Sequence, residues 1–254
     1  MALATARTID VLEALGNSLQ PLSMAEIVAL TGIGRASAGR LLASMIEGGA
    51  VLSEGEPPRY RLGLRCWSLG VGAVRQHPVV ATALPHLIEL CRSLMTRINV
   101  AVPEGLDAVY LQSVEPVGAR LTVERTYTRT PLLATASGRV LAAFSSEEAI
   151  RRLGEFGLPK LTPHTRTAAE ILAELPEVRA RGYATIDREQ DPEFSGVAVP
   201  IRDRSGAAVA AVGLPVVGPL NPEFLSGVLR PALEVAANVS VEMGLPLRQT
   251  RPLA

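Results

Sequence analysis

Side chains capable of covalent or metal chemistry are few and scattered in this sequence. Each of the three histidines, His77, His86 and His164, lies next to a proline, and none has the spacing of a metal-binding H-E-x-x-H pair. Cys66 and Cys91 do not form a C-x-x-C motif. The sequence also lacks a G-x-S-x-G elbow, a phosphate-binding P-loop and a G-x-G-x-x-G fingerprint. We therefore predict no catalytic residue, no metal site, no cofactor and no enzymatic activity.

Arginine guanidinium groups are the remaining side chains with evident binding chemistry, because they donate hydrogen bonds to phosphate. The whole chain is neutral, with 25 basic and 25 acidic residues. Residues 1–75 hold seven arginines and six acids, so the number of charges indicates no particular partner. Their placement is more informative. Arg35 and Arg40 fall in one predicted helix, and Arg59 and Arg61 fall on one predicted two-stranded hairpin.

The elements that would position these arginines follow from capping residues and glycine stops. Ser23 and Glu26 have the spacing of a capping box, which predicts a helix that ends at Gly32. We expect Ile27 and Leu30 to face inward from this helix. Further helices are predicted at about 5–15 and 35–47, the latter burying Leu41, Leu42 and Met45, and short strands at 51–52 and 60–62. This order predicts a winged helix-turn-helix over residues 1–63, a unit that inserts its second helix into the DNA major groove.

The outward face of helix 35–47 would carry Ala36, Arg40, Ala43 and Glu47. Small side chains on that face would let the helix approach base edges closely. The residues expected to contact DNA are Arg35, Ala36 and Gly39 near bases, Ser37 and Arg40 at phosphate or sugar, and Arg59 and Arg61 at the backbone or minor groove. A protein-interaction module, with Arg40 paired to Glu47 or Glu13, is the alternative for this unit.

The rest of the chain predicts a second domain of mixed helices and strands. Residues 64–78 read as a linker helix that ends at His77-Pro78, and residues 79–254 form the second domain. Its predicted helices cover 79–97, 137–144, 146–156, 168–181 and 222–243, and its predicted strands cover 98–102, 108–113, 120–125, 183–186, 197–201 and 208–214. The fold class is therefore α+β, with a mostly antiparallel sheet.

Several segments in a fixed order resemble the IclR family of bacterial regulators. In the first domain they are Pro21-Leu22-Ser23, Leu30-Thr31-Gly32-Ile33, Arg40-Leu41-Leu42 and Tyr60-Arg-Leu-Gly63. In the second they are Thr130-Pro-Leu-Leu-Ala-Thr-Ala-Ser-Gly-Arg139, Arg181-Gly-Tyr183, Asp187, Ala198-Val-Pro200 and Asp203-Arg-Ser-Gly206. The resemblance implies a GAF-like effector-binding domain. It also implies a homodimer or homotetramer that binds a roughly palindromic double-stranded DNA operator, as a ligand-responsive repressor.

Residues 135–138 are the first candidate for an effector site. Thr135, Ala136, Ser137 and Gly138 open a predicted helix, whose free N–H groups would form an anion cradle. Ser137 is also expected to cap this helix. Asp187 and Ser195 are further candidate polar groups, although Asp187 could equally be a turn residue.

Four positions depart from the family members that bind small polar acids. A histidine is replaced by Leu133, a cysteine by Gly196, and two serines by Gly213 and Pro215. A pocket with fewer polar anchors compensates poorly for desolvating a compact carboxylate. We therefore predict a roomier, more apolar pocket that takes an aromatic or hydrophobic ligand. A member without any effector is the other possibility.

Location and one competing function complete the expectations. The absence of an apolar run of about 18 residues predicts no membrane partner. Two unpaired cysteines and the lack of a signal peptide favour a reducing cytoplasm. The acid-rich run at 187–191 is expected to be a solvated loop rather than a catalytic carboxylate pair. The competing function is a GAF-like small-molecule-binding protein or enzyme whose first domain mediates protein contacts.

Overall fold

The computed structural model describes residues 2–118 and 129–244. The strand predicted at 120–125 lies outside these described residues. The chain divides after Arg75 into two compact units.

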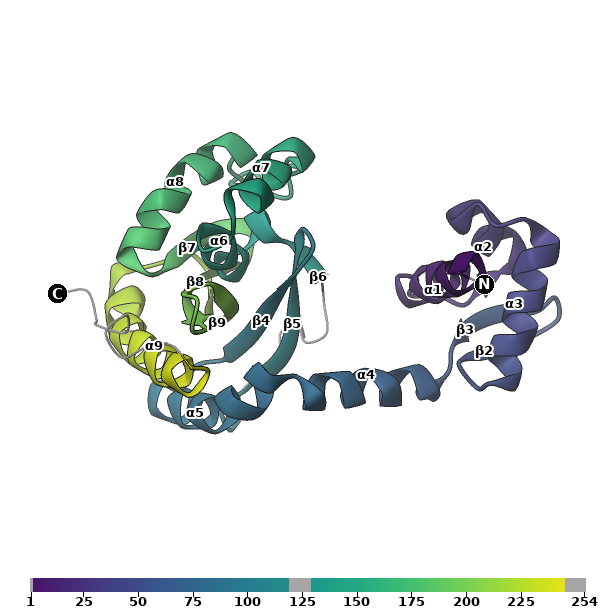
Figure 1. Ribbon diagram of the computed structural model, residues 1–254, viewed down its shortest axis with the longest axis horizontal. Coiled ribbons are helices and arrows are strands. Elements are labelled where there is room, and N and C mark those ends of the chain that lie inside the picture. Colours follow the sequence, from purple (N-terminus) through teal and green to yellow (C-terminus); the bar gives the residue numbers. More distant parts are fainter. Residues whose placement is uncertain (1, 119–128, 245–254) are drawn as a thin grey trace. The chain divides into compact units, whose positions relative to one another are not determined.

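The first unit consists of helices packed on a small antiparallel sheet (Figure 1). Within the described residues the sheet has three strands in the order β1-β3-β2. The elements are α1 (Ala2–Gly16), β1 (Leu22–Ser23), α2 (Met24–Thr31), α3 (Arg35–Glu47), β2 (Val51–Glu54), β3 (Arg59–Leu62) and α4 (Leu64–Gln76). The succession from α1 to β3 is the predicted winged helix-turn-helix, and α4 corresponds to the predicted linker helix. The two-residue strand β1 was not expected.

Local capping fixes both ends of α2. Ser23 caps α2, and its side chain and that of Glu26 form the predicted capping box. Gly32 ends α2 in the left-handed conformation that glycine adopts without strain. Ile27 is fully buried as predicted, whereas Leu30 is 65% exposed. The prediction for Leu30 was wrong because α2 has only eight residues and turns that side chain outward in its last turn.

The buried face of α3 differs from the prediction at one residue, Leu41. Ala38, Leu42 and Met45 are the buried positions of this helix. Leu41 is only partly buried and packs at the edge of the core. The remaining core residues come from the surrounding elements: Val11, Leu15, Leu22, Ile27, Ile33, Val51 and Tyr60.

The second unit is an α+β domain built on a curled antiparallel sheet. Among the described residues the sheet has six strands in the order β6-β5-β4-β9-β8-β7. The strands are β4 (Ile98–Glu104), β5 (Asp107–Val114), β6 (Arg129–Pro131), β7 (Ala184–Asp191), β8 (Phe194–Arg202) and β9 (Ala208–Val217). The helices are α5 (Pro78–Leu94), the 3₁₀ turn η1 (Leu132–Ala134), α6 (Ala136–Ala143), α7 (Glu147–Phe156), α8 (Ala168–Arg181) and α9 (Pro222–Glu242).

The helices of this unit lie on both faces of the sheet (Figure 1). Helices α5 and α9 pack together on one face, and α6 packs on the other against β8 and β9, with α7 and α8 outside it. All eight residues of α6 are buried. Gly138 explains how close α6 lies to η1, because a Cβ atom there would be 1.9 Å from the Leu132 carbonyl oxygen. Helix α6 is therefore the centre of the domain core.

Strand β7 contains an irregularity that the sequence did not predict. Its pairing with β8 runs regularly to Asp187↔Ser195 and resumes at Asp191↔Phe194. Between these pairs, Arg188 has a φ of 55°. The acid-rich run at 187–191 is thus a bulged strand rather than the expected solvated loop. A bulge redirects side chains, so consecutive residues here face different surroundings.

None of the helices in the described part of the chain is long and apolar enough to cross a membrane.

Candidate functional sites

The outward face of α3 is exposed and carries unpaired arginines. Ala36, Arg40, Ala43 and Glu47 are all exposed, as the helical spacing predicted. Among the described residues, Arg35 and Arg40 form no hydrogen bond or ion pair. The alternative pairing of Arg40 with Glu47 or Glu13 is therefore not present. Both guanidinium groups are available to an anionic partner.

The N-terminus of α3 is also open. Its N-cap is Gly34, which supplies no side-chain hydrogen bond. By contrast, Ser23, Thr135, Ser146, Thr167 and Asn221 cap α2, α6, α7, α8 and α9 through their side chains. The N–H groups of Ser37 and Ala38 bond the Gly34 carbonyl. The N–H groups of Arg35 and Ala36 precede the first intrahelical hydrogen bond. They lie at the positive end of the helix dipole, where a phosphate binds well.

Gly39 has a different environment from the other predicted DNA contacts. A Cβ atom at this position would lie 3.8 Å from the Met24 side chain at the start of α2. Gly39 therefore faces the neighbouring helix, at a distance where a Cβ atom would make an ordinary van der Waals contact.

The β2–β3 hairpin is the wing of the first unit, and its arginines are held by contacts within that unit. Arg59 donates to the Pro21 carbonyl at 2.8 Å and to Glu26 at 3.1 Å. Arg61 donates to Glu54 at 2.9 Å. These ion pairs are about half exposed, and exposed pairs contribute only about 0–1 kcal/mol. A phosphate can therefore replace the carboxylate partners at little cost.

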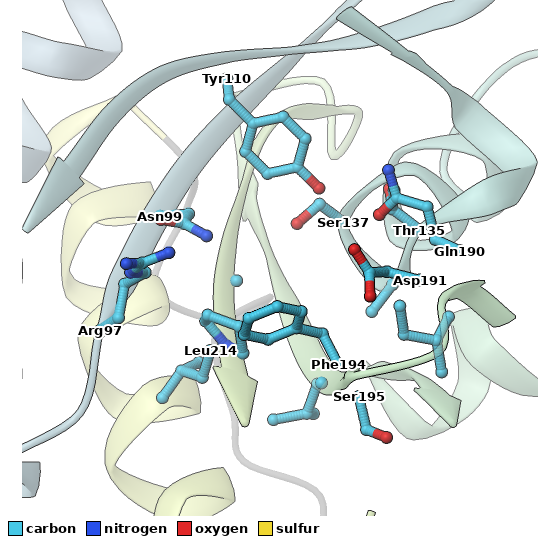
Figure 2. Close-up of a pocket in the computed structure, with 16 residues that line it drawn as sticks. Arg97, Asn99, Tyr110, Thr135, Ser137, Gln190, Asp191, Phe194, Ser195 and Leu214 are labelled. Carbon is cyan, nitrogen blue, oxygen red and sulfur yellow. The ribbon is translucent and has the colours of Figure 1, made fainter. Parts of the chain in front are cut away.

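The second unit contains a cavity of about 60 Å³ between α6 and the sheet (Figure 2). The N-terminal turn of α6 forms one wall, and β4, β5, β7, β8 and β9 form the others. The lining residues are Arg97, Asn99, Tyr110, Thr135, Ala136, Ser137, Ile186, Gln190, Asp191, Phe194, Ser195, Gly196, Val197, Gly213, Leu214 and Pro215.

One end of the cavity presents hydrogen-bond donors. Arg97 precedes β4 and pairs with Glu115. The Asn99 side-chain oxygen accepts a hydrogen bond from Ser113 at 3.0 Å. That bond leaves the amide nitrogen of Asn99 directed into the cavity, on the same side as Arg97 (Figure 2). This end therefore suits a carboxylate that would share the Arg97 guanidinium with Glu115.

The opposite end presents acceptors and amides. Asp191, Gln190 and Thr135 lie there, and the ring of Phe194 lies between the two ends (Figure 2). One Asp191 carboxylate oxygen accepts the Glu193 N–H at 2.9 Å. Thr135 Oγ1 accepts the Gly138 N–H at 2.9 Å and so caps α6. The expected cap, Ser137, instead points its hydroxyl into the cavity.

The structure brings seven of the predicted effector residues to the cavity and places three elsewhere. The seven are Thr135, Ala136, Ser137, Ser195, Gly196, Gly213 and Pro215. Leu133 does not line the cavity, because its side chain is buried in the core around α6. Gly138 does not line it either, because it faces the backbone of η1.

Asp187 also lies outside the cavity, in a cluster that ties strand ends together. The Ser195 hydroxyl is 3.0 Å from Asp187 Oδ1 and 2.6 Å from the Gly218 carbonyl oxygen. The Leu220 N–H donates to the same carboxylate oxygen. Hydrogen bonds from Arg188 and Ser195 lower the pKa of Asp187. Ser195 therefore turns its hydroxyl away from the cavity, and the predicted polar anchor is used to hold β7, β8 and the chain after β9.

Gly213 controls the depth of the cavity. It pairs with Asn99 across β4 and β9. A Cβ atom at Gly213 would lie 2.7 Å from Ser137 Oγ. A serine at this position would occupy space that is open here, so the glycine enlarges the cavity.

The remaining polar cavity residues were missed from the sequence. Asn99 gave a usable signal, because it is an amide inside the apolar run Ile98–Val102. Gln190 and Asp191 gave none, since they reach the cavity only through the bulge in β7.

Comparison with known proteins identifies the family. The profile of the bacterial transcriptional regulator IclR C-terminal domain matches residues 71–240, and that of the IclR helix-turn-helix domain matches residues 4–55. The chain belongs to the IclR family. It is therefore a helix-turn-helix transcriptional regulator and not an enzyme.

Characterised relatives and solved structures of this family cover most of the chain. The Pca regulon regulatory protein of Pseudomonas putida is 31% identical over 82% of this chain and 72% of its own length. An IclR regulator from Alicyclobacillus acidocaldarius has a TM-score of 0.84 at 25% identity, covering 96% of this chain and all of that one. An IclR homologue from Microbacterium hydrocarbonoxydans, solved with 4-hydroxybenzoate, has a TM-score of 0.77 at 25% identity over 94% and 98% of the two chains.

Proposed function

We propose that this IclR-family regulator is a repressor that binds a roughly palindromic operator through α3, as a dimer or tetramer. The observation that carries the proposal is the open N-terminus of α3, flanked by the unpaired Arg35 and Arg40. The N-terminal N–H groups and Arg40 would bond phosphates. Arg35 and Ala36 would approach base edges, and Arg59 and Arg61 would exchange their carboxylate partners for backbone phosphates.

Selection of sheared genomic DNA on the purified protein tests this function. Sequencing of the retained fragments at physiological salt should show a few intergenic sites that share an inverted repeat. Arg40→Ala, which leaves the core of the first unit intact, should retain the same sites in smaller amounts, because the loss of one phosphate contact weakens binding to all sequences. If the wild-type protein retains bulk DNA and enriches no site, operator recognition is contradicted.

The effector that the cavity fits best is an aromatic carboxylic acid with a polar group opposite the carboxylate. Arg97 and Asn99 would receive the carboxylate, and Asp191 and Gln190 would receive the distal polar group. Phe194, Leu214 and Ile186 supply an apolar middle. This charge distribution agrees with the 4-hydroxybenzoate bound to the Microbacterium homologue. A glyoxylate-sized acid would leave the far end of the cavity unused.

Binding a ring requires the cavity to open. Its volume is about 60 Å³, whereas an apolar cavity that admits benzene has about 150 Å³. Phe194 is only partly buried and lies across the space between the two ends. Its displacement would admit the ring and move the start of β8. The ligand would then bind the opened conformation better than the closed one, which is the requirement for shifting an equilibrium.

Titration calorimetry on the full chain tests the effector class. The compounds are 4-hydroxybenzoate, benzoate and glyoxylate. We expect 4-hydroxybenzoate to bind most tightly and glyoxylate most weakly. Benzoate should bind less well because the acceptor end of the cavity loses its partner. Tighter binding of glyoxylate than of 4-hydroxybenzoate would overturn the aromatic assignment.

Self-association is supported by α4. Among its described residues none is buried, and Leu64 and Trp67 are 81% and 65% exposed. With Val71 and Val74 they form one stripe at helical spacing, which we call the α4 stripe. A second copy of the chain would cover it. Residence in the cytoplasm, where Cys66 and Cys91 remain reduced, is part of the same proposal.

A further inference from the structure

A buried ion pair joins α6 to β7, the two elements that form opposite parts of the cavity wall. Arg139 is 1% exposed and Glu189 is 6% exposed. Arg139 Nη1 donates to Glu189 Oε1 at 2.9 Å, and Arg139 Nη2 donates to Glu189 Oε2 at 2.6 Å. This is the bidentate geometry that a guanidinium and a carboxylate form only when both are held in one plane.

Each partner of the pair also forms hydrogen bonds with the segments around it. Arg139 donates to the carbonyl oxygens of Leu133 at 3.0 Å and Thr185 at 3.3 Å. The Glu189 carbonyl accepts from the hydroxyls of Thr162 and Thr165 at 3.3 and 2.6 Å. The pair therefore joins η1, α6, β7 and the segment before α8 at one point.

The positions of the two charges relate them to the cavity walls. Arg139 follows Ser137 by two residues, and Glu189 immediately precedes Gln190. Ser137 belongs to the α6 wall and Gln190 to the β7 wall. Glu189 lies inside the bulge of β7, where regular pairing to β8 is interrupted and cannot fix the strand. Arg139 and the hydroxyls of Thr162 and Thr165 supply contacts that replace the missing strand pairing, and of these Arg139 alone comes from α6.

We propose that Arg139 and Glu189 are positioning residues for ligand recognition, which hold the α6 and β7 walls of the cavity in a fixed relation. This proposal rests on the proposed effector site only for its ligand-binding consequence. A buried ion pair gains little stability over apolar side chains of similar volume, because desolvation offsets the attraction. It does impose a definite geometry, and here that geometry directs Gln190 and Asp191 toward the ligand.

Hydrogen exchange without any ligand tests the positioning directly. In the wild-type chain under rising, sub-denaturing urea, amides of the first hydrogen-bonded turn of α6 (138–140) and of the bulge (188–191) should lose protection in the same step. Separate opening of the two segments would overturn the proposal. This measurement needs no variant.

Three variants separate positioning from stability. Glu189→Gln keeps the shape of the side chain and removes its charge. Arg139→Lys keeps the charge and removes the pair of guanidinium N–H groups that bonds both carboxylate oxygens. R139M/E189M replaces both with apolar groups and should fold. In each folded variant, exchange at 188–191 should accelerate at least tenfold, while β9 stays protected. The matched control is R230M/E234M, an exposed pair on α9 that should change neither segment. Unchanged exchange at 188–191 in R139M/E189M would refute the positioning role.

Calorimetry with 4-hydroxybenzoate gives the functional consequence. R139M/E189M should bind it at least tenfold more weakly than the wild-type chain, and R230M/E234M should bind it equally. Wild-type affinity in a fully folded R139M/E189M would overturn the proposal. If the wild-type chain does not bind 4-hydroxybenzoate, the proposed effector class fails, and the exchange experiment still decides the role of the pair.

Discussion

At Gly213 the absence of one side chain determines what the cavity can hold. A Cβ atom there would approach Ser137 Oγ to 2.7 Å, in the middle of the α6 wall. We therefore expect Gly213→Ser to reduce the affinity for aromatic acids at least tenfold, because the added hydroxymethyl group fills the space for the ring. Glyoxylate binding should be retained or improved. Calorimetry with both acids measures the change.

A compensating substitution makes this prediction specific. Ser137→Ala removes the atom that the new Cβ would meet. G213A/S137A should therefore bind the aromatic acid more tightly than Gly213→Ala alone. If Gly213→Ala and Gly213→Ser bind the ring as well as the wild-type chain does, the cavity is not the ligand site.

Arg40 is the residue where electrostatic binding to DNA can be measured most cleanly, since it is exposed and unpaired. Arg40→Ala should weaken binding to all DNA sequences and reduce the slope of log K against log salt by about 1. Arg59→Ala should have a smaller effect, because Arg59 must first leave Glu26 and Pro21. Arg230→Ala, in the second unit, is the control. Equal salt slopes for the wild-type and Arg40→Ala chains would remove Arg40 from the phosphate contacts.

At the scale of elements, the capping box of α2 makes the first unit sensitive to acid. Hydrogen bonds from Ser23, followed by the nearby charge of Arg59, lower the pKa of Glu26 below its ordinary value of 4.5. The stabilisation is therefore complete above pH 4.5 and is lost as the pH falls through the lower folded-state value. Hydrogen exchange of α2 amides should increase over that interval. Glu26→Gln should remove the pH dependence, whereas Glu47→Gln, on α3, should leave it unchanged.

The contact of α6 with η1 predicts a severe effect from one methyl group. Gly138→Ala would place a Cβ atom 1.9 Å from the Leu132 carbonyl oxygen. Neither backbone can move without disturbing the core, so we expect a loss of more than about 3 kcal/mol, beyond the usual cost of overpacking. Gly227→Ala in α9 is the matched control, since no atom lies within 4 Å of its Cβ position. It should stabilise the chain by about 0.4–1 kcal/mol. Urea denaturation followed by circular dichroism measures both.

The elements themselves were largely predictable, because their signals are local. Ser23, Glu26 and Gly32 fix the limits of α2 through their own side chains and backbone. Strands β4, β5, β7, β8 and β9 and their antiparallel pairing also follow from apolar runs separated by turns, whereas the short strand β6 was not predicted. The cavity was predictable only in part. Thr135 and Ser137 could be placed from a helix start, but Gln190 and Asp191 reach the cavity through a bulge that a buried ion pair stabilises. Such long-range contacts leave no local pattern.

At the scale of the whole molecule, effector binding and operator binding can be linked only if the effector binds two conformations of the chain with different affinities. A ligand that opens the cavity can release DNA only if the opened domain favours an arrangement of DNA-binding units that fits the operator less well. A coupling of about 1–3 kcal/mol would change operator affinity roughly 5- to 150-fold. Two half-sites require two copies of the chain, so self-association is a condition for this linkage.

The α4 stripe is where we expect that association to occur. Replacing Leu64 and Trp67 with glutamate should shift the chain toward the monomer in sedimentation experiments, because two charges on each copy would be buried in the interface. Operator affinity should fall with it, while each copy keeps its α3 surface and its salt-dependent binding to nonspecific DNA. Leu69→Glu is the matched control, since Leu69 is 66% exposed but lies on the opposite side of α4. If L64E/W67E sediments as the wild-type chain does, the two copies of the chain must associate through another surface.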